Sequence, residues 1–151
     1  MMEINKFSNI RNGESIGFVL RILMNHLSQS LSHIFQKNGI TSTEFLVLRE
    51  VFENESISSC SIALHLKLNK GSISKILDQL AYKKLIKKEI SSLDKRVQKI
   101  FLTEKAYKTL PELAALIQLK EKDIFAILTD SERNTLYSLV EKIVSAQNEH
   151  Y

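Results

Sequence analysis

Residues 69–103 read NKGSISKILDQLAYKKLIKKEISSLDKRVQKIFLT. The first part of this stretch predicts a helix, because its apolar residues recur at three- and four-residue steps. These residues are Ile73, Ile76, Leu77 and Leu80. After Leu85 the apolar residues approach alternation on both sides of the turn-forming residues 91–95, which predicts a two-stranded hairpin. A helix followed directly by a cationic hairpin is typical of a DNA-binding domain.

Positive charge is concentrated in this part of the chain. The whole chain carries a net charge of +4, from 21 Lys and Arg against 17 Asp and Glu. Between Lys67 and Lys108 there are 12 basic and four acidic residues, a local charge of +8, so the remainder carries −4. A charge distribution polarised in this way gives one face a positive potential, which favours binding to a polyanion. On charge alone, a solvated lysine-rich surface stays open as the alternative.

Composition narrows the class of protein. With 151 residues and 44% hydrophobic content, the chain can bury one proper core. Only four Gly and one Pro favour helices over most of the length. One cysteine cannot form an internal disulfide, and no apolar run is long enough for a signal peptide or a membrane span, so we expect a cytoplasmic protein without membrane contact.

Two helices are predicted before the central stretch. The first is long and amphipathic and should end near Asn38, because Gly39 suits a left-handed C-cap. Its apolar stripe is Ile16, Leu20, Leu23, Leu27, Leu31 and Ile34. Thr41 and Glu44 then form a capping box that opens a second helix. The apolar residues of this second helix are Phe45, Leu48, Val51 and Phe52.

A short third helix completes a helix-turn-helix with the helix that begins near Asn69. Ser58 or Ser59 caps it, and Ile62, Ala63 and Leu66 should face inward.

Two more helices are predicted after the hairpin. Thr103 should cap a helix that runs to Leu128, with a bend or a local break at Pro111. Thr129 and Glu132 form a second capping box, which opens a last helix. The apolar residues of that last helix are Leu136, Leu139, Val140 and Ile143.

The terminal helices have apolar stripes that the central unit does not obviously cover. A second copy of the chain is their natural partner, so we predict a homodimer. The expected fold is therefore mainly α with a small β-hairpin wing (α+β): a winged helix-turn-helix with N- and C-terminal dimerisation helices. The predicted regions are 1–40 for the N-terminal dimerisation helix, 41–104 for the winged helix-turn-helix and 105–151 for the C-terminal dimerisation helices.

These residues resemble the MarR family of transcriptional regulators over nearly the whole chain. Residues 57–63 are similar to the first segment of the family's helix-turn-helix, and residues 72–80 to its recognition helix. The most recognisable signature is Asp94-Lys95-Arg96 followed by Leu102-Thr103. Two positions depart from the pattern, because Lys84 and Ala106 stand where the family usually has Gly. Both are positions where glycine permits backbone conformations that Lys and Ala adopt less readily.

The resemblance implies a repressor that binds a palindromic operator and is released by a small aromatic or lipophilic acid. The outer face of the recognition helix would meet the major groove, where Gln79 can pair with adenine and Lys75 with guanine or phosphate. Arg96 would enter the minor groove, and Asp94 would hold the wing in shape through an ion pair. The predicted DNA-binding residues are Ser58, Lys70, Gly71, Ser72, Ser74, Lys75, Gln79, Lys95 and Arg96.

Other candidate sites carry weaker signals. Cys60 lies between Ser59 and Ser61, which supply no positive charge to activate a thiolate, so we expect a packing or bystander residue. His26 and His33 lie two turns apart, too far for a compact metal pair, and fit buried or interfacial positions better. No phosphate-binding glycine loop, nucleophile elbow or paired metal-binding cysteines occur, so we expect no catalysis, metal or cofactor.

The sequence thus favours a sequence-specific regulator of double-stranded DNA. The main alternative is a winged helix that acts as a protein-interaction adaptor or complex subunit. An adaptor of that kind would carry an apolar outer face on its recognition helix, whereas this face is rich in serine, lysine and glutamine.

Overall fold

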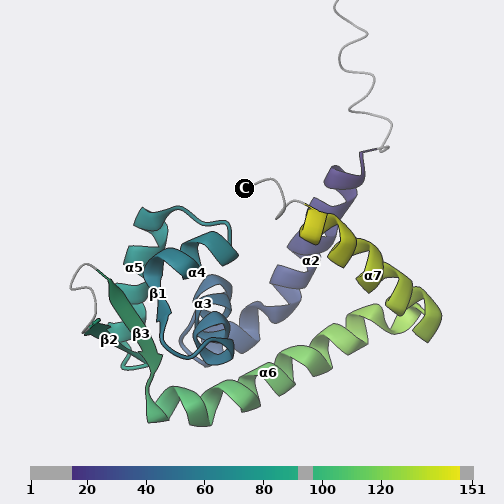
Figure 1. The fold of residues 1–151 in the computed structure, drawn as a ribbon. Coiled ribbons are helices and arrows are strands. Elements are labelled where there is room, and N and C mark those ends of the chain that lie inside the picture. Colours follow the sequence, from purple (N-terminus) through teal and green to yellow (C-terminus); the bar gives the residue numbers. More distant parts are fainter. Residues whose placement is uncertain (1–14, 92–96, 147–151) are drawn as a thin grey trace, which may run out of the picture. The chain divides into compact units, whose positions relative to one another are not determined.

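The computed structural model describes residues 15–91 and 97–146 (Figure 1). Most of the described chain is helical, and it divides into two compact units between Ile117 and Gln118. The elements in order are α2 (Ile16–Lys37), α3 (Ser42–Glu53), β1 (Ile57–Ser58), α4 (Ser59–His65), α5 (Lys70–Tyr82), β2 (Ile86–Ile90), β3 (Gln98–Leu102), α6 (Glu104–Ile124), the 3-10 helix η2 (Phe125–Ile127) and α7 (Asp130–Ala146).

The first unit is a winged helix-turn-helix, which confirms the predicted fold class. β2 and β3 form the expected antiparallel hairpin, with Ile86 opposite Leu102 and Ile90 opposite Gln98. The sheet also contains a strand that was not predicted, because β1 pairs with β3 and gives the order β1-β3-β2. This strand is only two residues long, so it leaves no alternation in the sequence to detect.

Capping side chains begin three helices where the sequence predicts them. At α3 the Thr41 hydroxyl accepts a hydrogen bond from the Glu44 amide at 3.1 Å, and the Glu44 carboxylate accepts one from the Thr41 amide at 2.7 Å. At α4 the cap is Ser58, and at α6 the Thr103 hydroxyl accepts from the Ala106 amide. Helix α2 ends at Lys37 and is followed by Gly39 with φ +65°, as the left-handed C-cap requires.

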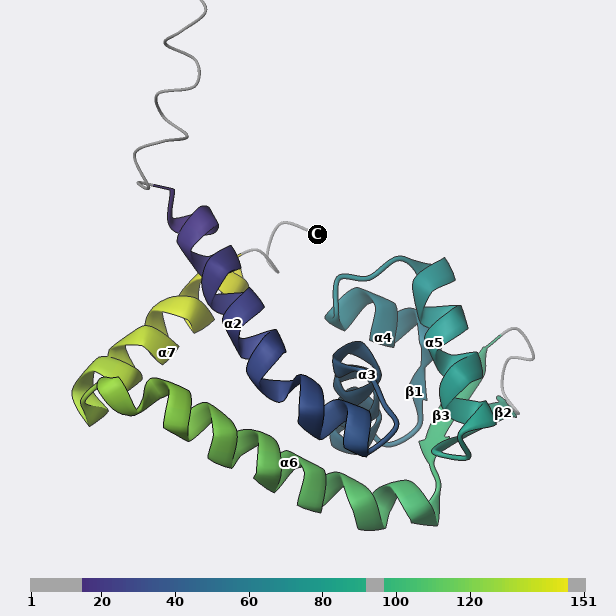
Figure 2. The ribbon, with the colours of Figure 1, turned by 180° about the vertical axis from the view of Figure 1, so that it is seen from behind.

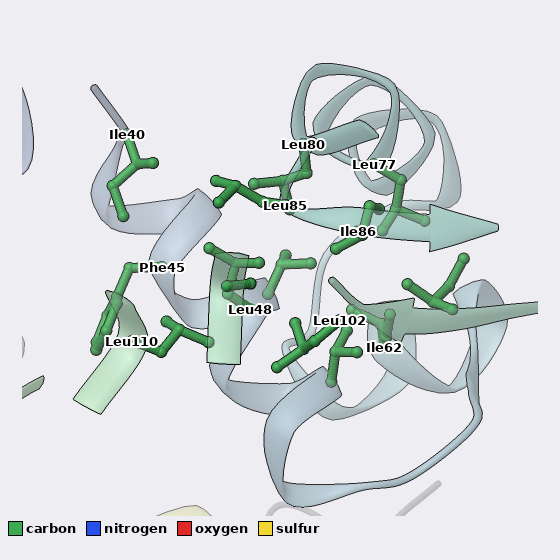
Figure 3. Packing of buried hydrophobic residues seen from close by; sticks show 14 of the residues in the cluster. Ile40, Phe45, Leu48, Ile62, Leu77, Leu80, Leu85, Ile86, Leu102 and Leu110 are labelled. Atoms are coloured by element: carbon green, nitrogen blue, oxygen red, sulfur yellow. The ribbon is translucent and has the colours of Figure 1, made fainter. Parts of the chain in front are cut away.

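One hydrophobic core joins these elements (Figure 3). Its largest fully buried apolar side chains are Val47, Leu48, Ile62, Ile73, Leu77, Leu80 and Ile100. Phe52, an apolar residue of the second predicted helix, is 48% exposed. It lies in the last turn of α3, at the edge of the core, where its ring packs against Tyr107 of α6 with centroids 6.0 Å apart. Val47, which was not among the apolar residues named for this helix, is fully buried.

Helix α6 differs from the prediction in two ways. It continues without interruption through Pro111, so the predicted local break is wrong. Pro111 and Tyr107, whose carbonyl loses its helical donor, are both exposed, so water can satisfy that carbonyl. The helix also stops at Ile124 and not at Leu128, whose backbone is extended with ψ 141°.

The second unit is built around α7 and its cap. The predicted capping box is confirmed, because Thr129 and Glu132 exchange backbone and side-chain hydrogen bonds. Arg133 donates to the carbonyls of Phe125 and Leu128 and thereby satisfies the end of the preceding 3-10 turn. No described residue of α7 is buried. Its exposed apolar residues are Tyr137, Leu139, Val140, Ile143 and Val144.

The N-terminal half of α2 is similarly uncovered. Only Leu31 and Phe35, near its C-terminal end, are buried. The exposed apolar residues of the other half are Ile16, Phe18, Val19, Leu20, Ile22 and Met24. Among the described residues, no helix is both long and apolar enough to cross a membrane.

Candidate nucleic-acid interface

The recognition helix α5 has one buried face and one polar face. The Asn69 side chain caps it by accepting a hydrogen bond from the Ser72 amide at 2.7 Å. Ile73, Leu77 and Leu80 turn into the core. The exposed residues of the helix are Lys70, Gly71, Ser74, Lys75, Asp78, Gln79 and Tyr82, and Ser72 is half-buried. The sequence therefore predicted the outer face of this helix correctly as an accessible polar surface.

The hairpin lies directly beside this helix. Strand β2 packs against α5, and the two views show them side by side (Figures 1 and 2). A shallow hollow lies where α4, α5 and the hairpin meet. Its lining residues are Ser59, Cys60, Lys70, Ser74, Leu77, Lys88 and Gln98. Two predicted DNA-binding residues, Lys70 and Ser74, are thus brought next to the hairpin.

Other predicted residues have different surroundings. The Ser58 hydroxyl accepts from the Ser61 amide at 3.0 Å and shares a 2.8 Å hydrogen bond with the Ser61 hydroxyl, so it caps α4. Gly71 has helical backbone, and a Cβ there would lie 3.4 Å from the Asn69 Oδ1. The wing residues Asp94, Lys95 and Arg96 lie outside the described residues.

Several lysines of the basic segment make contacts within the protein. Lys83 Nζ donates to both carboxylate oxygens of Glu44 at 2.7 Å. Lys88 Nζ donates to Asp78 Oδ1 at 2.5 Å, which ties β2 to the recognition helix. Lys99 Nζ donates to the backbone carbonyl of a loop residue before β1. Sequence reasoning missed these partners, because they lie 10 to 43 residues apart and leave no periodic signal.

The Glu44 carboxylate is the buried end of one of these pairs. Its side chain is only 1% exposed, and it serves the α3 capping box while it binds Lys83 at the end of α5. A buried carboxylate without such partners would be strongly destabilising. The pair therefore fixes the start of α3 against the end of the recognition helix.

The junction between α5, the hairpin and α6 carries both departures from the family pattern. Lys84 adopts φ +58°, the left-handed conformation that favours glycine, and its carbonyl accepts a 2.8 Å hydrogen bond from the Thr103 hydroxyl. Ala106 is fully buried. Lys84 thus adopts the left-handed conformation of the turn in place of glycine, and the Ala106 methyl group packs in the core.

The residues considered for redox or metal chemistry are all accessible. Cys60 is exposed in the hollow. His26 and His33 are exposed on α2, so in this chain the buried alternative does not hold. The part of the chain that the structure describes contains no group of three or more His, Cys, Asp or Glu that could hold a metal ion.

Comparison with known proteins agrees with the winged helix. Residues 40–97 match the model of the MarR family. The regulator MgrA of Staphylococcus aureus is 32% identical over 81 residues, which cover 54% of this chain and 55% of MgrA. The chain thus spans about half the length of this relative.

Solved structures share the fold over more of the chain. A cysteine-to-serine mutant of MarR from E. coli, in complex with operator DNA, superposes with a TM-score of 0.80 at 22% identity, covering 91% of this chain and 96% of MarR. The PcaV regulator of Streptomyces coelicolor, in complex with its natural ligand, gives 0.79 at 17% identity, covering 89% and 94%. The family match over residues 40–97 and the similarity to MgrA agree with the resemblance of the sequence to the MarR family of transcriptional regulators, and the solved structures share the winged helix-turn-helix fold of this chain.

Proposed function

We propose that this chain binds double-stranded DNA as a homodimer in the cytoplasm and represses transcription at a palindromic operator. One observation carries the proposal: the exposed face of α5 is polar and basic, and it lies beside a lysine-bearing hairpin. A helix of this kind fits the major groove, and a neighbouring hairpin reaches the flanking backbone. The adaptor alternative would need an apolar face at this place.

The contacts divide into two kinds. Gln79 and Lys75 are both exposed one turn apart on α5, where they would reach base edges. Lys70, Ser72, Ser74 and the backbone at Gly71 lie near the start of the helix and would hold the phosphate backbone. Ser58 would do so through the start of α4. Arg96 would enter the minor groove, Lys95 would add a DNA contact from the wing, and Asp94 would hold the wing in shape through an ion pair.

Assembly and regulation are part of the same proposal. The exposed apolar residues of α2 and α7 would be covered by a second copy of the chain, which places two recognition helices on one duplex. A small aromatic or lipophilic acid is the proposed releasing effector. The relatives with this fold are regulators, and one of them is known with its natural ligand.

The test begins with selection of bound duplexes from a random DNA pool. We expect a symmetric site whose half-sites lie about 10 base pairs apart, one turn along one face of the duplex. Affinity for this duplex and for a shuffled one would then be titrated across a salt series. Absence of binding to any duplex at low salt would contradict the proposal.

Two substitutions separate the contributions of the wing and the helix. Arg96→Ala should weaken binding to every duplex, most at A·T-rich flanks, and reduce the salt slope by about 1. Gln79→Ala should relax the preference at one base pair per half-site and cost about 1 to 3 kcal/mol on the preferred base. An unchanged salt slope in Arg96→Ala would remove the wing from the proposed interface.

A further inference from the structure

An acidic residue stands on the face of the recognition helix that the proposed function turns toward DNA. Asp78 lies between Lys75 and Gln79 on the exposed side of α5, and its side chain is 70% exposed. A carboxylate facing a phosphate backbone is repelled, so its presence there needs a physical reason. Either it reads a base directly, as a carboxylate can by accepting from cytosine, or it serves another residue.

The structure favours the second explanation, that Asp78 serves another residue. Lys88 of β2 donates to Asp78 Oδ1 at 2.5 Å. Its side chain is only 20% exposed, because it lies in the hollow between α4, α5 and the hairpin. Lys88 pairs across the hairpin with Ile100, which is fully buried at the centre of the sheet. The ion pair therefore joins the middle of the recognition helix to the strand-paired part of the hairpin.

Strand alternation explains why this lysine and not its neighbours takes the contact. Lys87 and Glu89 are exposed on either side of Lys88 in β2. Successive side chains of a strand point to opposite faces, so these two turn away from the face that Lys88 presents to α5. Glu89 lies opposite Lys99 in the hairpin. It offers a carboxylate of the same charge as Asp78, one residue away from Lys88, on the wrong side to hold the helix.

We infer that Asp78 and Lys88 are a positioning pair that sets DNA specificity. This inference rests on the proposed DNA-binding function. Asp78 holds β2 at a fixed place beside the recognition helix, so that helix and wing meet their grooves in one register. It also withholds Lys88 from backbone phosphates, which lowers affinity for DNA of any sequence. Specificity is the difference between the affinity for the operator and the affinity for other DNA. The fixed register raises the first affinity and the withheld lysine lowers the second, so both effects raise specificity.

The experiment compares two duplexes for each variant: one selected by the wild type from a random pool, and a shuffled duplex of equal composition. We expect Asp78→Asn to weaken binding to the selected duplex about twofold to fivefold, the range of an exposed ion pair. Binding to the shuffled duplex should become tighter, and its salt slope should steepen by about 1 because Lys88 becomes available to a phosphate. The conservative variant Asp78→Glu should restore most of the affinity ratio.

Lys88→Gln supplies the second half of a double-mutant cycle. It should also weaken binding to the selected duplex, without steepening the salt slope. In the Lys88→Gln background, Asp78→Asn should leave the ratio of the two affinities nearly unchanged, because the partner is already gone. Glu89→Gln is the matched control. It removes the same charge one residue away from Lys88 and should strengthen binding to both duplexes equally, leaving their ratio unchanged.

Three results would overturn the inference. Asp78→Asn could behave as Glu89→Gln does, which would leave only general electrostatics. The effects of Asp78→Asn and Lys88→Gln could multiply independently in the double variant. Asp78→Asn could alter preference at a single base pair whether or not Lys88 is present, which would make Asp78 a base-reading residue. Failure of the wild type to bind any duplex at low salt would instead overturn the proposed function, and the inference with it.

Discussion

The winged core and the terminal helices use the same amphipathic pattern with opposite results. In α5 the residues at helical spacing, Ile73, Leu77 and Leu80, are buried within the chain. In α7 residues at the same spacing, such as Leu139 and Ile143, remain more than half exposed. The N-terminal half of α2 resembles α7 in this respect. An apolar stripe therefore predicts that a helix will be covered, and it does not say whether the cover comes from the same chain.

Truncation of a core side chain should have the largest effect on stability. Leu80→Ala removes a fully buried side chain at the centre of the winged unit, and we expect the free energy of unfolding to fall by about 3 kcal/mol or more. Urea denaturation measures this. Leu64→Ala is the control, because Leu64 is exposed on α4 of the same unit and should change stability by about 0.5 kcal/mol or less. Equal losses in both variants would mean that the core is misassigned.

Loss of the buried carboxylate should come next. Glu44→Gln leaves Lys83 without its counter-charge, and removal of one partner from a buried ion pair costs about 3 to 5 kcal/mol. We expect the lower end of this range, because the Lys83 side chain is 32% exposed and water can reach it. Thermal or urea unfolding would show the loss. Glu53→Gln, which breaks the exposed pair with Arg49 on the same helix, should cost less than about 1 kcal/mol.

A charge placed among the exposed apolar residues of α7 should weaken dimerisation and leave the core intact. Ile143→Asp places a carboxylate in the proposed dimer interface, and a loss of about 2 kcal/mol would weaken dimerisation about 30-fold. Analytical ultracentrifugation over a dilution series measures the dissociation constant. Ser138→Asp introduces the same charge on the opposite side of α7 and should leave it unchanged. A wild-type chain that sediments as a folded monomer at micromolar concentration would contradict the dimer.

The smallest predicted effect concerns the cap of α7. The Thr129 backbone amide, and then its hydroxyl, donate to the Glu132 carboxylate and lower the pKa of that group below its ordinary value of 4.5. The charged form is therefore the one that stabilises the fold. Its contribution is present above the unfolded pKa and is lost as the pH falls through the lowered folded pKa.

A pH series tests this cap directly. The wild type should be slightly more stable than Glu132→Gln at neutral pH, and the difference should disappear as the pH falls below about 4.5. Unfolding monitored by circular dichroism at each pH measures it. Glu141→Gln, in the same helix but far from its N-terminus, serves as the control. A difference that grew toward low pH would contradict the assigned sign.

Local sequence signals determined where most helices begin, because caps and left-handed turns depend on residues three or four positions apart. Thr41 with Glu44, Thr129 with Glu132, and Gly39 each stand where the sequence placed them. The hairpin and the polar face of α5 followed from periodicity in the same way. The two-residue strand β1 and the exposed position of Phe52 did not, because pairing with β3 and the edge of the core are properties of the assembled unit.

What only the tertiary structure decided is how the charges of the basic segment are used. The sequence alone established an excess of lysine around the predicted helix and hairpin, and the MarR resemblance that the family match confirms. It proposed some of these lysines as DNA contacts, but it gave no partner within the protein to Lys83 or Lys88. The folded chain pairs Lys83 with Glu44 and Lys88 with Asp78, and it leaves Lys75 exposed on the face of α5. Ion pairs between residues distant in sequence require the backbone to bring them within a few ångströms, and no local pattern encodes that distance.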